Sequence, residues 1–231
     1  MLLDSVQVGA SGLAKIAAGD IAIFVRLAFW ESLGRDSQRI RHGAELDEEE
    51  AIDLVVAAKA TEAEARGAAL LGRAEQPRFV LRSKLLERGY PGASVDLALE
   101  RLEKEGFLSD RRYAETWLRA RVDRAIRSAR SPSPGSARAE GPSSLLVSLR
   151  ARSLSETDAK AALVAVLDEE TRPALLAAAI ARLSADDRPA GEEADPKPGR
   201  STGSRGGAGD LVGALRELGW KGEEIREALE L

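Results

Sequence analysis

Arginines form the densest set of chemically active side chains in this sequence. Between Arg78 and Arg130 the chain has 13 Lys and Arg against 8 Asp and Glu, although its net charge is -4. At about 100° per residue of helix, four of them fall within an arc of about 80°. These four are Arg112, Arg119, Arg127 and Arg130. Guanidinium groups bind phosphate and carboxylate oxygens, so the stripe indicates either a surface for an acidic partner or an ordinary solvated helix face.

Residues for enzymatic chemistry are sparse. His42 is the only histidine and cysteine is absent, which excludes a cysteine-histidine zinc site. His42 precedes Gly43 in a loop-like stretch and is expected to be a surface residue. The acids at 47–50 are explained as a helix start, and no G-x-x-x-x-G-K-[ST] phosphate loop occurs. We therefore predict a protein that is not an enzyme and that needs no metal or cofactor.

The composition is that of a folded, soluble chain. Of its 231 residues 44% are hydrophobic and 31% are charged, so it is too apolar to be wholly disordered. The longest apolar run, residues 21–30, is interrupted by Arg26 and is far shorter than the roughly 20 residues that span a bilayer. We expect a cytoplasmic protein that does not bind membranes.

Local patterns predict a short β region followed by helices. The first 43 residues contain three strand-like segments, 4–8, 13–17 and 20–27, separated by glycine-containing turns. From residue 44 the hydrophobic period becomes helical. Asp47 with Glu50, and Thr61 with Glu64, match the capping-box spacing, so we expect two helices over 44–76 with Pro77 as the stop.

A two-helix pattern occurs twice, in residues 81–102 and 211–231, related by a shift of 130 positions. The matched residues of the first copy are Leu81, Leu85, Gly89 and Tyr90, and those of the last copy are Leu211, Leu215, Gly219 and Trp220. Each glycine falls where a helix is expected to end in the left-handed conformation. A weaker copy at a shift of 64 places Leu145 and Leu149 at the leucine positions and Ser153 at the glycine position.

Third helices complete these units. In the first copy, Gly106 ends the second helix, and Ser109 and Asp110 are expected to cap a third that carries Tyr113 and Trp117. Units that cannot bury their own apolar faces predict a mainly α fold of tandem three-helix repeats in an elongated array, with a short N-terminal β-strand region. The predicted boundaries are 1–43 for the β-rich segment, 44–76 for connecting helices, 77–127 for the first repeat, 128–142 for a flexible linker, 143–183 for the second repeat, 184–209 for a flexible linker and 210–231 for a truncated third repeat.

Two of these strings resemble sequence elements of the RecX family of recombination regulators. LRSKLLERGY resembles the family's L-x-x-K-L-x-x-K-G-[FY], and GFLSDRRYAETWLRAR resembles its G-[YF]-[LI]-D-D-x-x-[FY]-A-x-x-[WF]-[VI]-x-x-R. The matching residues of the second element are Gly106, Phe107, Leu108, Asp110, Tyr113, Ala114, Trp117, Leu118 and Arg121. Ser109 replaces the first aspartate. The resemblance implies a helical-repeat protein that binds RecA and the RecA–DNA filament and mainly inhibits recombinase activity, within homologous recombination, DNA repair and the SOS response.

Two functions are compatible with these patterns. The first is a monomeric regulator that contacts a RecA–DNA filament. The second is a direct DNA binder, because a capped three-helix unit with a basic third helix is also typical of helix-turn-helix proteins. The resemblance favours the first. Candidate contact residues are the four stripe arginines together with Lys221 and Arg226 of the last repeat.

The remaining side chains of these helices are expected to be structural. Arg121 and Arg124 lie nearer the apolar side of the third helix and are expected to bond carboxylates there. The aromatic side chains are at core spacings and are expected to pack rather than stack on bases. They are Tyr90, Phe107, Tyr113 and Trp117.

Overall fold

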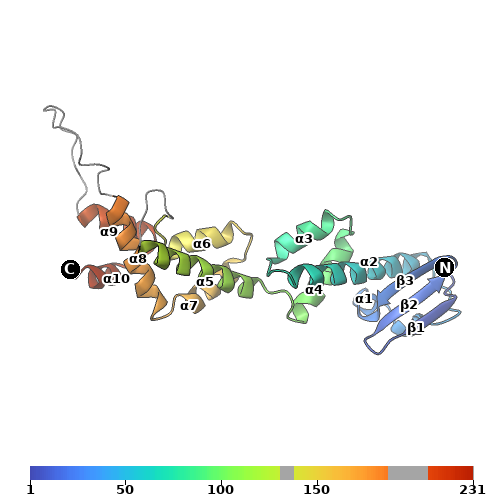
Figure 1. The fold of residues 1–231 in the computed structure, drawn as a ribbon. Coiled ribbons are helices and arrows are strands. Elements are labelled where there is room, and N and C mark those ends of the chain that lie inside the picture. The colour runs from blue at the N-terminus through green and yellow to red at the C-terminus, as the bar shows by residue number, and fades with distance from the viewer. Residues whose placement is uncertain (131–137, 187–207, 231) are drawn as a thin grey trace, which may run out of the picture. The chain divides into compact units, whose positions relative to one another are not determined.

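The computed structural model of the chain describes residues 1–130, 138–186 and 208–230, in two compact units, Met1–Asp110 and Arg111–Leu231 (Figure 1). The first unit contains β1 (Ser5–Val8), β2 (Leu13–Ala18), β3 (Ile21–Arg26), α1 (Leu27–Ser32), a 3-10 turn (Ser37–Arg39), α2 (Glu48–Leu71), α3 (Arg78–Leu86) and α4 (Gly92–Lys104). The remaining helices are α5 (Asp110–Ala129), α6 (Pro142–Arg150), α7 (Glu156–Val166), α8 (Thr171–Asp186), α9 (Ala208–Glu217) and α10 (Gly222–Leu229). The predicted mainly α fold with a short N-terminal β region is confirmed.

The three strands form an antiparallel meander in the order β1-β2-β3. Because side chains alternate along a strand, Ala14, Ile16 and Val25 share the buried face of the sheet. This face packs in one core with Trp30 of α1 and Leu54 of α2. The sheet therefore depends on the first half of α2 to cover its apolar side.

Helix α2 is one continuous helix, so the prediction of a second helix start at Thr61 is wrong. Asp47 does form the predicted capping box with Glu50. Thr61 lies in the helix interior, where its hydroxyl donates to the Ala57 carbonyl at 2.9 Å and accepts the Arg26 N–H at 2.8 Å. A threonine can satisfy its hydroxyl on the preceding turn of a helix, so the capping spacing alone does not define a boundary.

Pro77 does not end this helix either. Helix α2 stops at Leu71, with Gly72 as its C-cap, and Pro77 is the N-cap residue of α3. Its fixed φ suits the entry to a helix, but its side chain offers no oxygen to the free N–H groups of the first turn.

A buried carboxylate joins three elements of the first unit. Glu64 of α2 is 6% exposed, and its two oxygens accept from Arg26 Nε of β3 at 2.7 Å and Arg101 Nε of α4 at 3.0 Å. Ser94 of α4 also donates to the Val56 carbonyl of α2 at 2.9 Å. The second half of α2 is thus held to α4 by polar contacts as well as by apolar packing.

The glycines predicted to end helices have the expected backbone. Gly89, Gly106 and Gly219 have φ of 83°, 77° and 90°, in the region that side chains with a Cβ disfavour. Ser153, at the equivalent position of the weaker copy, also has a positive φ of 60°. The turn geometry is therefore present in all three copies, and in the middle copy a serine adopts it.

In the second unit, the start of α6 lies against the turn after α9. The Ser143 N–H donates to the Leu218 carbonyl at 2.9 Å. A Cβ on Gly141 would lie 2.5 Å from that carbonyl oxygen, and a Cβ on Gly219 would lie 2.2 Å from Ser143 Oγ. The two backbone segments approach so closely that neither position has room for a side chain.

Helix α5 buries its apolar face in the second unit. Ala114, Leu118 and Val122 belong to one core with Leu145 of α6 and Trp220 of the α9–α10 turn, whereas the sequence grouped α5 with α3 and α4. This core also contains residues of α7, α8, α9 and α10. The repeat boundaries remain a prediction.

Most of the predicted linker residues lie outside the described ranges. These are residues 131–137 of the linker predicted at 128–142 and residues 187–207 of the linker predicted at 184–209. The described margins of both segments include helical residues, because α5 runs to Ala129, α6 begins at Pro142, α8 runs to Asp186 and α9 begins at Ala208.

Of the aromatic residues expected to be buried, Phe107 is the exception, with 56% exposure. Its neighbour Leu108 is 2% exposed and donates its N–H to the Leu102 carbonyl at 3.0 Å. After the turn at Gly106 only one of two adjacent side chains can enter the core, and it is the leucine. Tyr90, Tyr113 and Trp117 pack as expected at the margins of the cores.

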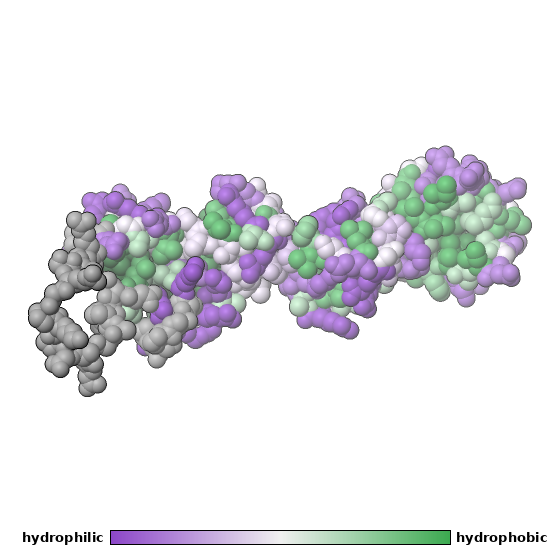
Figure 2. Space-filling view, turned by 90° about the horizontal axis from the view of Figure 1, so that it is seen from above, coloured by the Kyte–Doolittle hydropathy of each residue, from purple (hydrophilic) through white to green (hydrophobic). Residues whose placement is uncertain are grey.

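Figure 2 shows that apolar residues gather on one face of the first unit, at the right-hand end of the view. Large apolar side chains exposed in this unit include Ile21 and Phe24 of β3 and Ile52 and Val55 of α2, at 52–62% exposure. The predicted arginine stripe belongs to the other unit.

Gly89→Ala should lower the free energy of unfolding by about 1 kcal/mol, because the left-handed backbone at this position penalises a Cβ. No atom lies within 4 Å of the place that a Cβ would occupy, so the loss of stability would come from backbone strain and not from a steric clash. Thermal unfolding followed by circular dichroism measures it.

Gly213→Ala is the matched control, because Gly213 lies within α9, has open space at its Cβ and no positive φ. It should raise stability by about 0.5–1 kcal/mol. Ser153→Gly, the reverse substitution at an equivalent turn, should also raise stability. Equal effects of the two alanine substitutions would contradict the assignment of a strained turn at Gly89.

Stability of the first unit should fall in acid partly through Glu50. Arg39 Nε and Nη2 donate to its carboxylate at 2.9 and 2.8 Å, the Asp47 N–H donates at 3.1 Å, and these contacts lower the pKa of Glu50 to about 2. The unfolded pKa is about 4.3. The contribution is therefore complete above about pH 4.3 and is lost as the pH falls toward about 2.

Glu50→Gln should reduce the dependence of the unfolding free energy on pH between about 5 and 2, measured by urea unfolding at each pH. Glu48→Gln, on the same helical turn and exposed, is the control. If the unfolding free energy of the Glu50 variant depended on pH as that of the parent does, Glu50 would not contribute to acid sensitivity.

Candidate partner-binding surface

Helix α5 presents the predicted arginine stripe on the side opposite its buried residues. Arg112, Arg119, Arg127 and Arg130 are all exposed, while Ala114, Leu118 and Val122 are fully buried. A single amphipathic helix thus fixes both the position and the direction of the four guanidinium groups. The structure brings these four predicted residues onto one surface.

The charge of the stripe is only partly neutralised. Arg119 Nη2 lies 3.2 Å from Glu115 Oε2, and the same carboxylate accepts from Arg111 Nε at 3.1 Å. Within the ranges that the structure describes, the side chains of Arg127 and Arg130 have no carboxylate partner. The C-terminal half of α5 therefore carries its most available positive charge.

Two arginine side chains make cation–π contacts with Trp117 of α5. The Arg152 guanidinium lies 4.3 Å from the centre of the Trp117 ring, and that of Arg121 lies 5.4 Å from it. Arg121 also pairs with Glu140, which is 6% exposed and accepts from Ser144 Oγ at 3.0 Å. Cation–π contacts of this kind stabilise by about 0.5–2 kcal/mol each. They fix the face of α5 that opposes the stripe.

The predicted distinction between the stripe and the inner arginines holds for Arg121 and is wrong for Arg124. Arg121 bonds a carboxylate at the edge of the core, as expected. Arg124 is exposed, since its position on the helix lies far enough from Val122 to leave the core. It widens the basic surface beyond the four predicted residues.

Asp110 makes a long-range contact that sequence reasoning missed. Its Oδ1 accepts the Arg78 N–H at 2.6 Å, at the start of α3, where Pro77 provides no side-chain cap. A carboxylate at a helix N-terminus satisfies a free donor and interacts favourably with the helix dipole. No local pattern signals this contact, because the two residues are far apart in the sequence.

Lys221 and Arg226, the other predicted contact residues, lie on a different helix from the stripe. Both are exposed. Lys221 is the N-cap residue of α10 and donates its N–H to Glu224 Oε2 at 2.8 Å, and Arg226 Nε donates to the Gly222 carbonyl at 3.3 Å. These two residues form a separate candidate surface.

The described residues contain no group of three or more His, Asp or Glu side chains arranged to hold a metal ion. None of the described helices combines the length and the apolar character needed to cross a bilayer.

Comparison with known proteins identifies relatives over part of the chain, although no family model matches it. The chain is 46% identical to "Regulatory protein RecX" of Pseudomonas entomophila (strain L48) over 52 residues, which are 22% of this chain and 34% of that protein. It is 34% identical to "Regulatory protein RecX" of Treponema pallidum (strain Nichols) over 119 residues, which are 52% of this chain and 65% of that protein.

The fold is shared over a greater length. A crystal structure of a regulatory protein RecX superposes with a TM-score of 0.62 at 17% identity and covers 100% of this chain and 99% of that one. The chain thus resembles RecX proteins in part of its sequence and shares the fold of this RecX structure. The predicted resemblance to the RecX family is thereby confirmed, although the matched sequence spans only about a third of the Pseudomonas RecX protein.

Glu140→Gln should destabilise the second unit by about 1–3 kcal/mol, because it leaves Arg121 without a carboxylate and weakens a buried hydrogen-bonded contact. Chemical unfolding followed by circular dichroism measures the change. Glu170→Gln, at an exposed position of the same unit, is the control and should change stability by less than about 0.5 kcal/mol. Equal stabilities of the two variants would contradict this role of Glu140.

Proposed function

We propose that this chain binds RecA and the RecA–DNA filament and mainly inhibits recombinase activity, as a cytoplasmic monomer without catalytic activity of its own. The observation that carries the proposal is the exposed arginine stripe on α5, in a chain that resembles RecX proteins in sequence and fold. The name of the relatives supports a regulatory role, and the stripe supplies a surface on which such a role can act.

The stripe suits an extended, negatively charged partner. Its four guanidinium groups lie along one side of a 20-residue helix, so they can contact carboxylates or phosphates spaced along a filament. Their binding requires no rearrangement of the core, because the apolar face of α5 is buried on the opposite side. Screening by salt should weaken such contacts, since the charges meet across solvent.

Direct DNA binding is the second candidate, and the same stripe favours it. The two functions differ in what the arginines contact, which is the RecA–DNA filament in the first and a specific DNA sequence in the second. A regulator that acts on the filament should bind naked DNA weakly and lose that binding steeply with salt, whereas a sequence-specific DNA binder should retain selective affinity. Titration of labelled duplexes of different sequence at two salt concentrations separates the two.

The decisive experiment adds the full chain to the cognate RecA in DNA-dependent ATPase and strand-exchange assays. We expect inhibition at fewer than one chain per RecA subunit, because linked binding surfaces on one chain gain from effective concentration. Replacing Arg112, Arg119, Arg127 and Arg130 with Glu should weaken filament binding by about tenfold or more and reduce its salt dependence.

A charge-matched variant is the control. Arg41, Arg73, Arg88 and Lys104 are exposed and lie outside α5, so their replacement with Glu changes the net charge equally without touching the stripe. Both variants should keep parental helicity, because exposed substitutions cost little stability. Equal inhibition by the two variants would exclude the stripe, and a parent without effect on RecA at excess would exclude the proposed function.

A further inference from the structure

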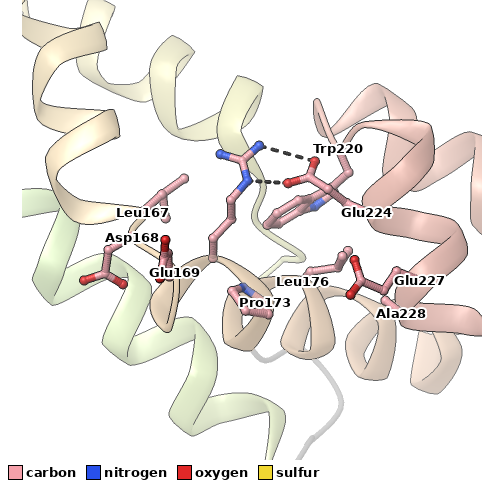
Figure 3. Close-up of a pocket in the computed structure, with 10 residues that line it drawn as sticks. Leu167, Asp168, Glu169, Pro173, Leu176, Trp220, Glu224, Glu227 and Ala228 are labelled. Atoms are coloured by element: carbon pink, nitrogen blue, oxygen red, sulfur yellow. Dashed lines mark hydrogen bonds and ion pairs between the residues drawn. The ribbon is translucent and has the colours of Figure 1, made fainter.

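The second unit contains a groove of about 530 Å³ between α8 and α10 (Figure 3). Its apolar lining includes Pro173 and Leu176 of α8, Trp220 of the α9–α10 turn and Ala228 of α10. Trp220 and Leu176 are 3% and 4% exposed, so the groove ends against the core of the unit. None of its lining residues belongs to the arginine stripe on α5.

The equivalent surface of the first unit is closed. The shift of 130 residues pairs Ser94 with Glu224 and Ala98 with Ala228. In α4, Ser94 and Ala98 are fully buried, and the Ser94 hydroxyl donates to the Val56 carbonyl of α2. In α10, Ala228 is exposed and borders the groove. A helix face that α2 covers in one copy is therefore left partly uncovered in the last.

The rim of the groove is acidic. Asp168, Glu169, Glu224 and Glu227 line it together with one cation, Arg172. Arg172 is already engaged, since its Nε pairs with Glu224, its Nη2 lies 3.3 Å from the same carboxylate, and its guanidinium stacks over Trp220 at 5.7 Å.

The remaining carboxylates are available to a ligand. Glu169 and Glu227 are exposed, and the described part of the chain offers neither side chain an ion-pair partner. The N–H groups of Thr171 and Glu170 donate to Asp168 Oδ1 at 2.8 and 3.2 Å and lower the pKa of Asp168. The groove thus joins an apolar floor to a surplus of carboxylates over cations.

We propose that this groove binds a protein segment in which an apolar side chain is flanked by Lys or Arg. The apolar side chain would pack against Leu176 and Trp220, and the cations would pair with Glu169 and Glu227. Charge complementarity selects this occupant over nucleic acid, whose phosphates the rim repels. The site is independent of the arginine stripe and goes beyond the proposed function, because it requires a partner of the opposite charge.

The test uses the full chain and a fluorescein-labelled amphipathic peptide with Leu on one helical face and Lys on the other. Fluorescence anisotropy should show binding by the parent that weakens with added salt. Glu169→Lys with Glu227→Lys should weaken it by about tenfold, and Ala228→Phe should weaken it similarly without a change of charge, by filling the groove.

Glu170→Lys with Glu223→Lys is the matched control. Both residues are exposed neighbours that do not line the groove, and this variant should bind the peptide within about threefold of the parent. Equal losses in the two charge variants, parental binding by the Ala228 variant, or no binding by the parent would overturn the proposal. So would concentration-dependent self-association of the parent that Ala228→Phe abolishes, since a second copy would then occupy the groove.

Discussion

The short helices of this protein depend on contacts with longer ones. Helices α3, α4, α6, α7, α9 and α10 have between 8 and 13 residues, and isolated helices of this length are only marginally stable in water. Each pair lies next to a longer helix, and residues of all three share a core or direct contacts. The 24-residue helix α2 has the additional task of covering the sheet.

The two units differ in how completely a long helix covers the short helix packed against it. Where the cover is incomplete, a surface remains open to a partner. In the first unit, Glu64 joins α2 to both β3 and α4 through two arginines, and α2 fully buries Ser94 of α4. In the second unit, Arg172 of α8 pairs with Glu224 of α10, and a groove lies beside this ion pair. On α5, by contrast, the Trp117 contacts secure one face so that the arginines of the other can remain in solvent.

The features that sequence reasoning predicted correctly depend on local spacing. The Asp47–Glu50 box and the left-handed glycines at 89, 106 and 219 each follow from a few adjacent residues. The errors and omissions involve contacts between distant parts of the chain. Thr61 matches a capping pattern but bonds the end of β3, and Asp110 supplies a cap that Pro77 cannot. The groove was missed because the repeat pattern records which residues match, and not how completely a neighbouring helix covers them.

Gly141 and Gly219 have consequences for the evolution of the chain. Gly141 has an extended backbone, φ −152°, that any residue can adopt, so it is restricted only by the close approach of Leu218 and of the Trp220 ring nitrogen. Gly219 is restricted by both its positive φ and the approach of Ser143. If α6 packed less closely against the turn after α9, Gly141 would have room for a side chain. Gly219 would still be restricted by its positive φ. Among homologues, substitutions at Gly141 should therefore accompany changes at Leu218 or Trp220, while Gly219 should stay invariant wherever the two-helix turn itself persists.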